Sequence, residues 1–150
     1  MKRRISLQVV EGRLVLTGVI ESKKLRIPKQ IMEFIVDTGS QNSYLSYLDV
    51  LRLQVPISEK PSDKEVDFGG SRFKQILLPT IKIHLLTDDK STTLTLEINI
   101  NALKTTKTAP KKVQIAESLP SILGMDFLKE QKLSLHIILT EDLAYLESEY

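Results

Sequence analysis

The sequence contains no cysteine, which excludes disulfide bonds and metal sites built on thiolates. Its only imidazoles are His84 and His136, and both lie in strand-like runs. We interpret both histidines as structural and expect neither a metal ion nor an organic cofactor. A helix that spans a membrane needs about 20 consecutive apolar residues, and the sequence has no such run. We therefore expect a cytoplasmic protein with no membrane partner.

An excess of charge of either sign is also absent. The chain has 21 basic and 19 acidic side chains, for a net charge of +2. This is too small to indicate a nucleic acid or an anionic membrane as a partner. The segment from Lys104 to Lys112 carries four lysines, and we interpret it as a solvated loop. A nucleic-acid accessory role for this segment is the weaker alternative.

The sequence contains enough apolar residues for one hydrophobic core. Its 150 residues are 41% hydrophobic, which suits a single domain over residues 1–150. No internal repeat or low-complexity segment divides the chain. We expect the aromatic side chains of Tyr44, Tyr47 and Phe127 to lie in the core.

Alternation of apolar and polar residues dominates the chain and predicts about nine short strands. Ser46 can cap a helix over 47–53, and Gly124 precedes a second short helix. Residues 18–27 have extended character, and Pro28 is expected to end this run. The residues from Glu141 are interpreted as an acidic tail. The pattern predicts a mainly β fold, an antiparallel barrel, closed or partly open, with one or two short helices. The expected strands cover 5–9, 14–17, 31–36, 43–45, 65–68, 72–78, 80–86, 91–100, 113–116 and 133–139.

One candidate for chemistry is the tetrapeptide Asp37-Thr38-Gly39-Ser40, which follows the apolar run 34–36 and occurs once. It places a carboxylate at a tight turn where a strand ends. A carboxylate that activates water for attack on an amide works best beside a second carboxyl, because the two then share one proton. One copy per chain implies a homodimer. Asp37 could equally be an ordinary turn former whose side chain bonds its own backbone.

Two later features decide between these readings. Ile122, Leu123 and Gly124 form a short apolar strand that ends at glycine before a helix start. Between the two motifs, Gly69-Gly70 is flanked by strand-like arms, as in a hairpin. In this order the motifs resemble those of the retropepsin-like aspartic proteases, over about 33–136. The version here looks closer to the cellular and retroelement branch, including the DNA-damage-inducible type, than to the viral one.

The resemblance implies an acid-protease barrel and a role for each matched position. Asp37 is the catalytic carboxylate, and the two copies meet across the twofold axis. Thr38 is expected to hydrogen-bond across that axis, and the Gly39 amide and the Ser40 hydroxyl to donate to the carboxylate. The donation from Ser40 would favour an acidic working range.

The same resemblance makes Phe68, Gly69, Gly70 and Ser71 a flap that closes over substrate. In the viral pattern an acidic residue and an arginine form an ion pair at the positions that hold Gln41 and Met125 here. Both members of that pair are absent from this chain.

The leading hypothesis is a homodimeric aspartic endopeptidase that cleaves extended peptide segments, acts at acidic pH and needs no cofactor. The alternative is a catalytically silent dimeric module that keeps the fold for peptide binding or assembly. Substitution of Asp37 separates the two, because only the enzyme depends on an ionisable group there.

Overall fold

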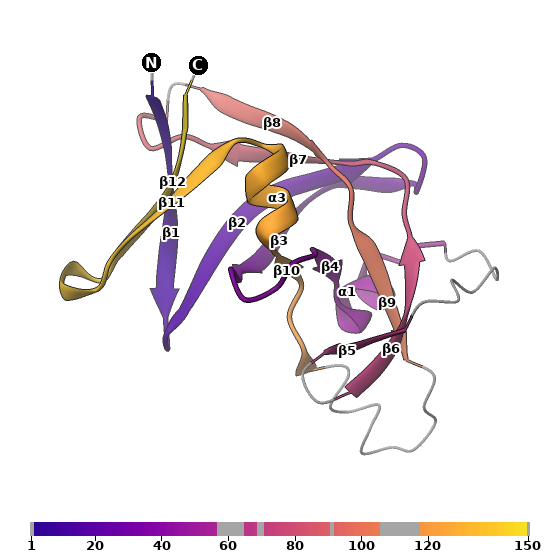
Figure 1. Cartoon of the computed structure of the whole chain (residues 1–150). Coiled ribbons are helices and arrows are strands. Elements are labelled where there is room, and N and C mark those ends of the chain that lie inside the picture. The colour runs from indigo at the N-terminus through magenta and orange to yellow at the C-terminus, as the bar shows by residue number, and fades with distance from the viewer. Residues whose placement is uncertain (1, 57–64, 69–70, 91, 106–117, 150) are drawn as a thin grey trace.

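The structure is a computed structural model that describes residues 2–56, 65–68, 71–90, 92–105 and 118–149 (Figure 1). The expected strand over 113–116, the Gly69-Gly70 turn and residues 106–112 of the lysine-bearing segment lie outside the described residues. The strands are β1 (Lys2–Val10), β2 (Arg13–Ser22), β3 (Ile27–Val36), β4 (Tyr44–Leu45), β5 (Glu65–Phe68), β6 (Ser71–Leu77), β7 (Ile81–Leu86), β8 (Thr93–Ile98), β9 (Asn101–Thr105), β10 (Ile122–Leu123), β11 (Leu133–Ile138) and β12 (Leu143–Glu149). The helices are α1 (Tyr47–Arg52), α3 (Met125–Glu130) and the 3₁₀ turn η1 (Leu139–Glu141).

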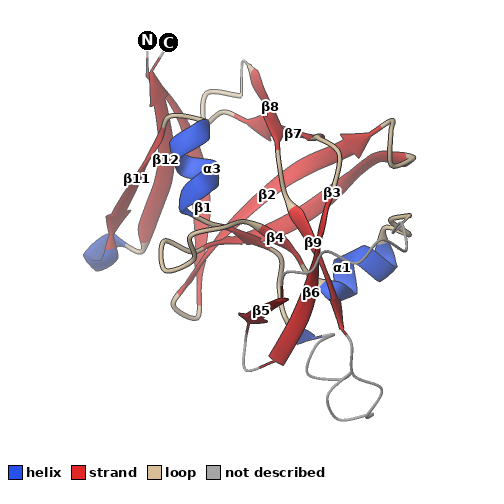
Figure 2. Ribbon diagram, turned by 45° about the vertical axis from the view of Figure 1, so that its right-hand side comes forward, coloured by secondary structure: helices blue, strands red, loops and turns tan. Residues whose placement is uncertain are grey.

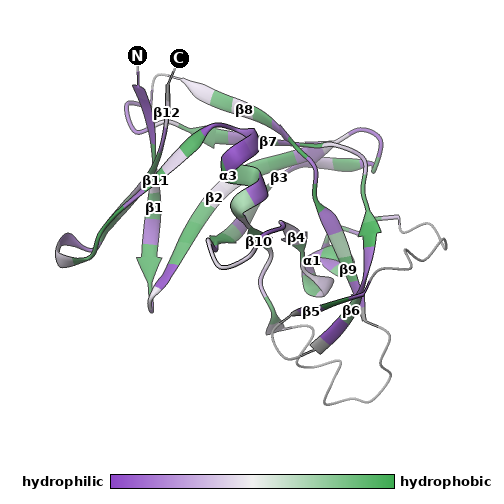
Figure 3. Cartoon of the chain, in the orientation of Figure 1, coloured by the Kyte–Doolittle hydropathy of each residue, from purple (hydrophilic) through white to green (hydrophobic). Residues whose placement is uncertain are grey.

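The N-terminal half folds as the alternation predicts. β1 and β2 are joined by Glu11 and Gly12, whose φ angles of 49° and 76° are both positive. Positive φ at both central residues is the type I′ geometry, which matches the twist of a two-residue hairpin. Hydrophobic and hydrophilic residues alternate along the long strands (Figure 3), so each strand buries one face.

The expected break at Pro28 does not occur, because Pro28 is the second residue of β3. A proline near the start of a strand removes at most one ladder bond, so the strand tolerates it. The rest of β3 pairs antiparallel with β2, from Val15 opposite Ile35 to Ile20 opposite Gln30. This long pairing carries the chain directly to Asp37.

The described strands form one sheet whose order is β11-β12-β1-β2-β3-β10-β4-β9-β6-β5, with β7 and β8 paired off this path. The group of β1, β11 and β12 lies at one end of the molecule and the β5–β6 hairpin at the other (Figure 2). The ends of this order do not pair with each other in the described part of the chain, so the sheet is open. The prediction of a mainly β fold with two short helices is confirmed, in the partly open form.

The C-terminal residues correct one expectation. Residues 143–149 form the strand β12 rather than a solvated acidic tail, and β12 lies between β11 and β1. Ala144 and Leu146 are fully buried on its inner face. On the outer face Glu147 is also buried, and its Oε2 accepts a bond of 2.8 Å from Nε of Arg4. Of the acidic residues that suggest a tail, Glu147 and Glu149 therefore belong to a paired strand.

The core is apolar and nearly continuous, and Phe34, Leu16 and Ile83 are among its most buried side chains. Tyr44 and Phe127 are buried and Tyr47 is half-buried, as expected. α1 begins after Ser46, whose Oγ accepts a hydrogen bond from the backbone of Asp49, so the expected cap is confirmed. None of the described helices is long and apolar enough to cross a membrane.

Candidate active site

Parallel pairing of β3 with β10 brings the two sequence motifs together. The backbone N–H of Ile35 donates to the carbonyl of Ser121 at 2.9 Å, and that of Asp37 donates to the carbonyl of Leu123 at 3.0 Å. Ile122 lies opposite Ile35 in this register, and Leu123 opposite Val36. The end of the second motif is therefore fixed against the start of the first.

The turn after β3 holds the Asp37 carboxylate in one position. Its Oδ1 accepts a hydrogen bond of 2.8 Å from the backbone N–H of Gly39. The carbonyl of Asp37 accepts a bond of 3.2 Å from the N–H of Ser40. The predicted donation from the Gly39 amide is thus present, although an ordinary turn-forming aspartate makes the same contact. Thr38 is exposed, and its expected bond across a dimer axis stays a prediction.

The Ser40 hydroxyl does not behave as expected. It donates to the carbonyl of Asn42 at 2.7 Å instead of to the Asp37 carboxylate. The loop doubles back after Gly39, so the nearest acceptor for this hydroxyl is a backbone oxygen two residues ahead. Ser40 therefore braces the loop, and the argument for an acidic working range no longer rests on it.

Gly124 lets the second motif approach the active-site loop at a distance that no side chain permits. A Cβ atom on Gly124 would lie 2.6 Å from the carbonyl oxygens of both Ser40 and Asn42. Just beyond it, the N–H of Met125 donates to the carbonyl of Ser40 at 2.8 Å, and that of Asp126 to the carbonyl of Gln41 at 3.1 Å. The segments that carry Gln41 and Met125, the positions that lack the viral ion pair, are thus joined by backbone hydrogen bonds to each other's neighbouring residues.

Asp126 is a site residue that the sequence reasoning missed. Its carboxylate accepts hydrogen bonds from the Ser43 hydroxyl at 2.6 Å and from the Ser43 N–H at 3.0 Å. It also accepts a bond of 2.7 Å from the N–H of Phe127. The Ser43 Oγ in turn accepts a bond of 2.9 Å from the N–H of Gly124. The available signal was an acid in the first turn of a helix, a position that favours negative charge.

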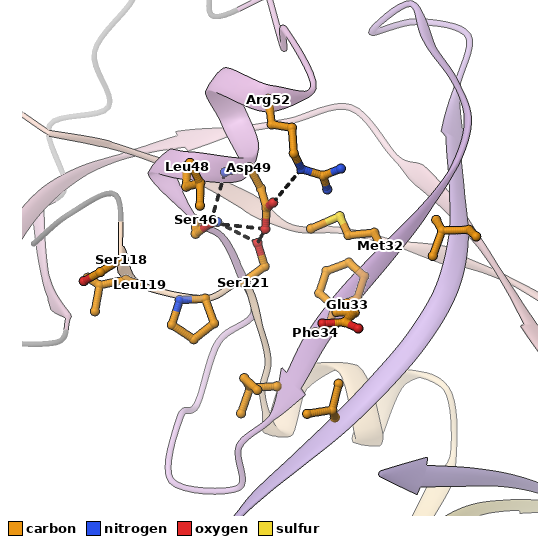
Figure 4. A pocket seen from close by; sticks show the side chains of 14 residues that line it. Met32, Glu33, Phe34, Ser46, Leu48, Asp49, Arg52, Ser118, Leu119 and Ser121 are labelled. Atoms are coloured by element: carbon orange, nitrogen blue, oxygen red, sulfur yellow. Dashed lines mark hydrogen bonds and ion pairs between the residues drawn. The ribbon is translucent and has the colours of Figure 1, made fainter. Parts of the chain in front are cut away.

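A second hydroxyl and carboxylate cluster holds α1 against the segment that leads into β10 (Figure 4). The Ser121 hydroxyl donates to Oδ2 of Asp49 at 2.5 Å and accepts a bond of 2.9 Å from the N–H of Ser46. Arg52 pairs with the other carboxylate oxygen of Asp49 at 3.2 Å. Together with the Ser43–Asp126 contacts, these bonds fix both sides of the β3–β10 junction.

The Asp37 turn opens into a cavity of about 710 Å³. Arg13 from the β1–β2 hairpin lines one part of it, and Val66 and Asp67 of β5 line another. The expected flap residues Phe68 and Ser71 end β5 and start β6, next to this wall. Ile122 also lines the cavity, with Leu119 and Pro120 before it. A cavity of this size is in the range of known ligand sites, and an ordinary turn aspartate does not require one.

Among the described residues, no cluster of three or more histidine, aspartate or glutamate side chains could hold a metal ion. Within the same residues, the acids that line the cavity are Asp37 and Asp67.

The whole fold is similar to that of solved aspartic proteases. The crystal structure of a retropepsin-like aspartic protease from Rickettsia conorii superposes with a TM-score of 0.57 and 17% sequence identity, over 98% of this chain and 92% of that chain. The chain has the retropepsin-like fold. The EIAV protease complexed with the inhibitor HBY-793 is also similar, with a TM-score of 0.50 and 13% identity over 85% of this chain and 96% of that chain. No protein-family model and no curated protein matches the sequence.

At these identities the likeness shows the retropepsin-like fold, and the case for chemistry rests on the residues of this chain. The parallel junction of the two motifs is the part of the fold that carries Asp37. Membership of the DNA-damage-inducible branch remains a prediction from the sequence.

Proposed function

We propose that this protein is a homodimeric aspartic endopeptidase. The observation that carries the proposal is the Asp37 carboxylate, oriented by the Gly39 amide in a cavity of a retropepsin-like fold. The likeness to aspartic proteases supports a protease-type function. A cytoplasmic location, in keeping with the absence of cysteine, is part of the same proposal.

The proposed reaction needs two carboxyl groups and one water molecule. The two Asp37 side chains of a dimer share one proton, because like charges at close range do not both ionise. The ionised carboxylate takes a proton from the water molecule as the water oxygen attacks the scissile carbonyl carbon. The protonated carboxyl donates a hydrogen bond to the developing oxyanion. A proton then passes to the leaving nitrogen as the C–N bond breaks. The shared proton favours acidic conditions, since one of the two groups must stay protonated.

The partner Asp37 must come from a second chain, and the structure limits where the two chains can pair. The edge of β1 near Arg4 and Ser6 is capped by Asp88, whose N–H donates to the carbonyl of Arg4 at 2.9 Å and whose Oδ1 accepts from the N–H of Ser6 at 2.8 Å. β1 also pairs with both β12 and β2. We expect the dimer interface to include the terminal strands over 4–9 and 133–139, and the first of these has little free edge to offer.

The second segment is better placed. β11 ends the described strand order, so its outer edge pairs with no described strand. Apolar side chains next to this edge are exposed, and Leu139 reaches 75% and Ile137 46%. An added strand from a second copy would pair with β11 and cover these side chains. We propose this edge, with the Asp37 loop, as the dimer contact.

The test compares Asp37→Asn with Asp67→Asn, which changes a carboxylate on the opposite wall of the same cavity. The wild-type chain is incubated with an unstructured protein at pH 4 to 6, and the products are identified by mass spectrometry. We expect Asp37→Asn to cleave at less than about a thousandth of the wild-type rate, because an amide can neither accept nor supply the shared proton. Asp67→Asn should keep most of the activity.

The rival function, a silent dimeric module, predicts a different outcome. It predicts no cleavage by the wild-type chain and unchanged dimerisation after Asp37→Asn. Activity that survives in Asp37→Asn, with wild-type product masses, would contradict the proposed mechanism. The flap role of Phe68, Gly69, Gly70 and Ser71 belongs to the same proposal.

A further inference from the structure

A second groove lies beside the catalytic cavity, along the edge of β3 that faces away from β2 (Figure 4). Its volume is about 470 Å³, and five consecutive residues of β3, 31–35, line it. Side chains of a strand alternate between its two faces, so a lining by consecutive residues means that the backbone edge itself borders the groove. α1 forms the opposite wall with Leu48, Asp49 and Arg52.

In the described part of the chain, the backbone of β3 has hydrogen-bonding groups without a partner along this edge. Ile35 directs its N–H toward the β10 side, where it meets the carbonyl of Ser121. N–H and C=O groups of alternate residues point to the same side of a strand, so those of Ile31 and Glu33 also face the groove. β10 extends only over Ile122–Leu123. Among the described residues, none pairs with the N–H or C=O of Ile31 or Glu33 on this side.

The exposed apolar side chains around this edge lie beside polar and charged ones, which include Glu33, Asp49 and Arg52. Ile31 is 68% exposed and Leu48 44% exposed. Arg52 and Asp49 neutralise each other at 3.2 Å. Glu33 is exposed on the outer face of β3 and makes no ion pair within the described part of the chain. Within the described residues, an occupant of this groove therefore meets exposed apolar side chains and one carboxylate, that of Glu33, without an ion-pair partner.

The groove adjoins the catalytic cavity, and Ile35, Leu119 and Pro120 line both. An open strand edge accepts an extended chain, which supplies the missing main-chain bonds.

We propose that this groove binds an extended peptide segment with a lysine or arginine by strand addition to β3. The peptide backbone bonds to Ile31 and Glu33 in line with β10. Its apolar side chains contact Ile31 and Leu48, and its basic side chain pairs with Glu33. Binding here does not depend on catalysis, so the site goes beyond the proposed function and can be tested in a chain that cannot cleave.

The test uses the full chain with Asp37→Asn and two labelled octapeptides of alternating threonine and valine, one with a central lysine and its twin with glutamate. Fluorescence anisotropy measures affinity, and amide NMR shifts locate the site. We expect the lysine peptide to bind about two- to fivefold tighter than its twin, which is the range that exposed ion pairs support. Glu33→Gln should abolish this preference and Glu33→Lys should reverse it. The largest shifts should fall on 31–35 and on α1.

A backbone variant tests strand addition separately from charge. Ile31→Pro removes the open N–H on the groove side, and proline is tolerated on a strand edge. We expect it to weaken both peptides by at least about tenfold, because the ring removes one main-chain bond and crowds the added strand. Ile31→Val keeps the N–H and should stay within twofold of the parent. Melting temperatures confirm that both variants are folded.

Three results would overturn the inference. One is an unchanged lysine preference in Glu33→Lys, and another is a set of shifts confined to the residues around Asp37. The third is a concentration-dependent dimer that Ile31→Pro abolishes, which would assign the edge to a second copy of this chain. A wild-type chain that cleaves nothing would refute the proposed protease function and leave peptide binding at β3 unaffected.

Discussion

Removal of the Asp126 carboxylate should destabilise the loop that carries Asp37, although the two residues are far apart in the sequence. Two of the bonds that it accepts come from Ser43, at 2.6 Å and 3.0 Å. Each hydrogen bond to a charged acceptor contributes about 1.5 kcal/mol at the low end of the measured range. Asp126→Ala should therefore lower the free energy of unfolding by about 3 kcal/mol. Asp126→Asn keeps one acceptor oxygen and should cost about 1 kcal/mol.

The assay is urea denaturation of four chains: Asp126→Ala, Asp126→Asn, Ser43→Ala, and the double variant with Asp126→Ala and Ser43→Ala. All are measured at one protomer concentration, because the stability of a dimer depends on concentration. Since Ser43 and Asp126 share their bonds, the losses should not add, and the coupling energy should be about 1–2 kcal/mol. Cleavage activity should fall in the same order as stability, because the Ser43 hydroxyl also accepts from the Gly124 N–H. Additive losses, or an Asp126→Ala chain as stable as the wild type, would refute the reasoning.

Three further predictions concern Gly124, Glu147 and the proposed dimer. Gly124→Ala should cost about 1–3 kcal/mol by overpacking, since its Cβ would lie 2.6 Å from the Ser40 carbonyl oxygen; an unchanged melting temperature would contradict this. The Arg4 hydrogen bond lowers the pKa of Glu147 below its ordinary value of 4.5, so its stabilisation is present above that pH and lost as pH falls through the lower folded value. Glu147→Gln should flatten the acid side of the melting-temperature profile, and an equally steep profile would contradict the assignment. Specific cleavage activity should fall on dilution as dimers dissociate, and sedimentation at the same concentrations checks it.

Much of the fold follows from local pattern, because each long strand buries one face and its alternation is visible without any partner. The hairpin at Glu11-Gly12 and the Ser46 cap are local in the same sense, since each depends on a few adjacent residues. The expectation of an acidic tail failed because it depends on a partner far along the chain. Glu147 reads as part of a solvated tail until Arg4, 143 positions earlier, pairs with it.

The candidate site also has some features that follow from adjacent residues and others that depend on the folded chain. The position of Asp37 at a strand end and the contact from the Gly39 amide follow from the turn itself. The orientation of the Ser40 hydroxyl depends on how the loop returns toward Asn42, and no local rule selects that acceptor. Asp126 acts through Ser43, 83 positions away, so the sequence shows only an acid at a helix start.

The β3–β10 junction explains why two short motifs, each weak alone, become a site in the folded chain. A parallel pair requires a long connection, and here the connection between Asp37 and Ile122 contains the β5–β6 hairpin that lines the opposite wall of the cavity. The pairing that orients the carboxylate thus also brings that wall over it. Because β10 covers only the end of β3, the rest of this β3 edge meets no other strand within the described residues and faces α1 across the groove. The short length of β10 therefore accounts for the groove that adjoins the Asp37 cavity.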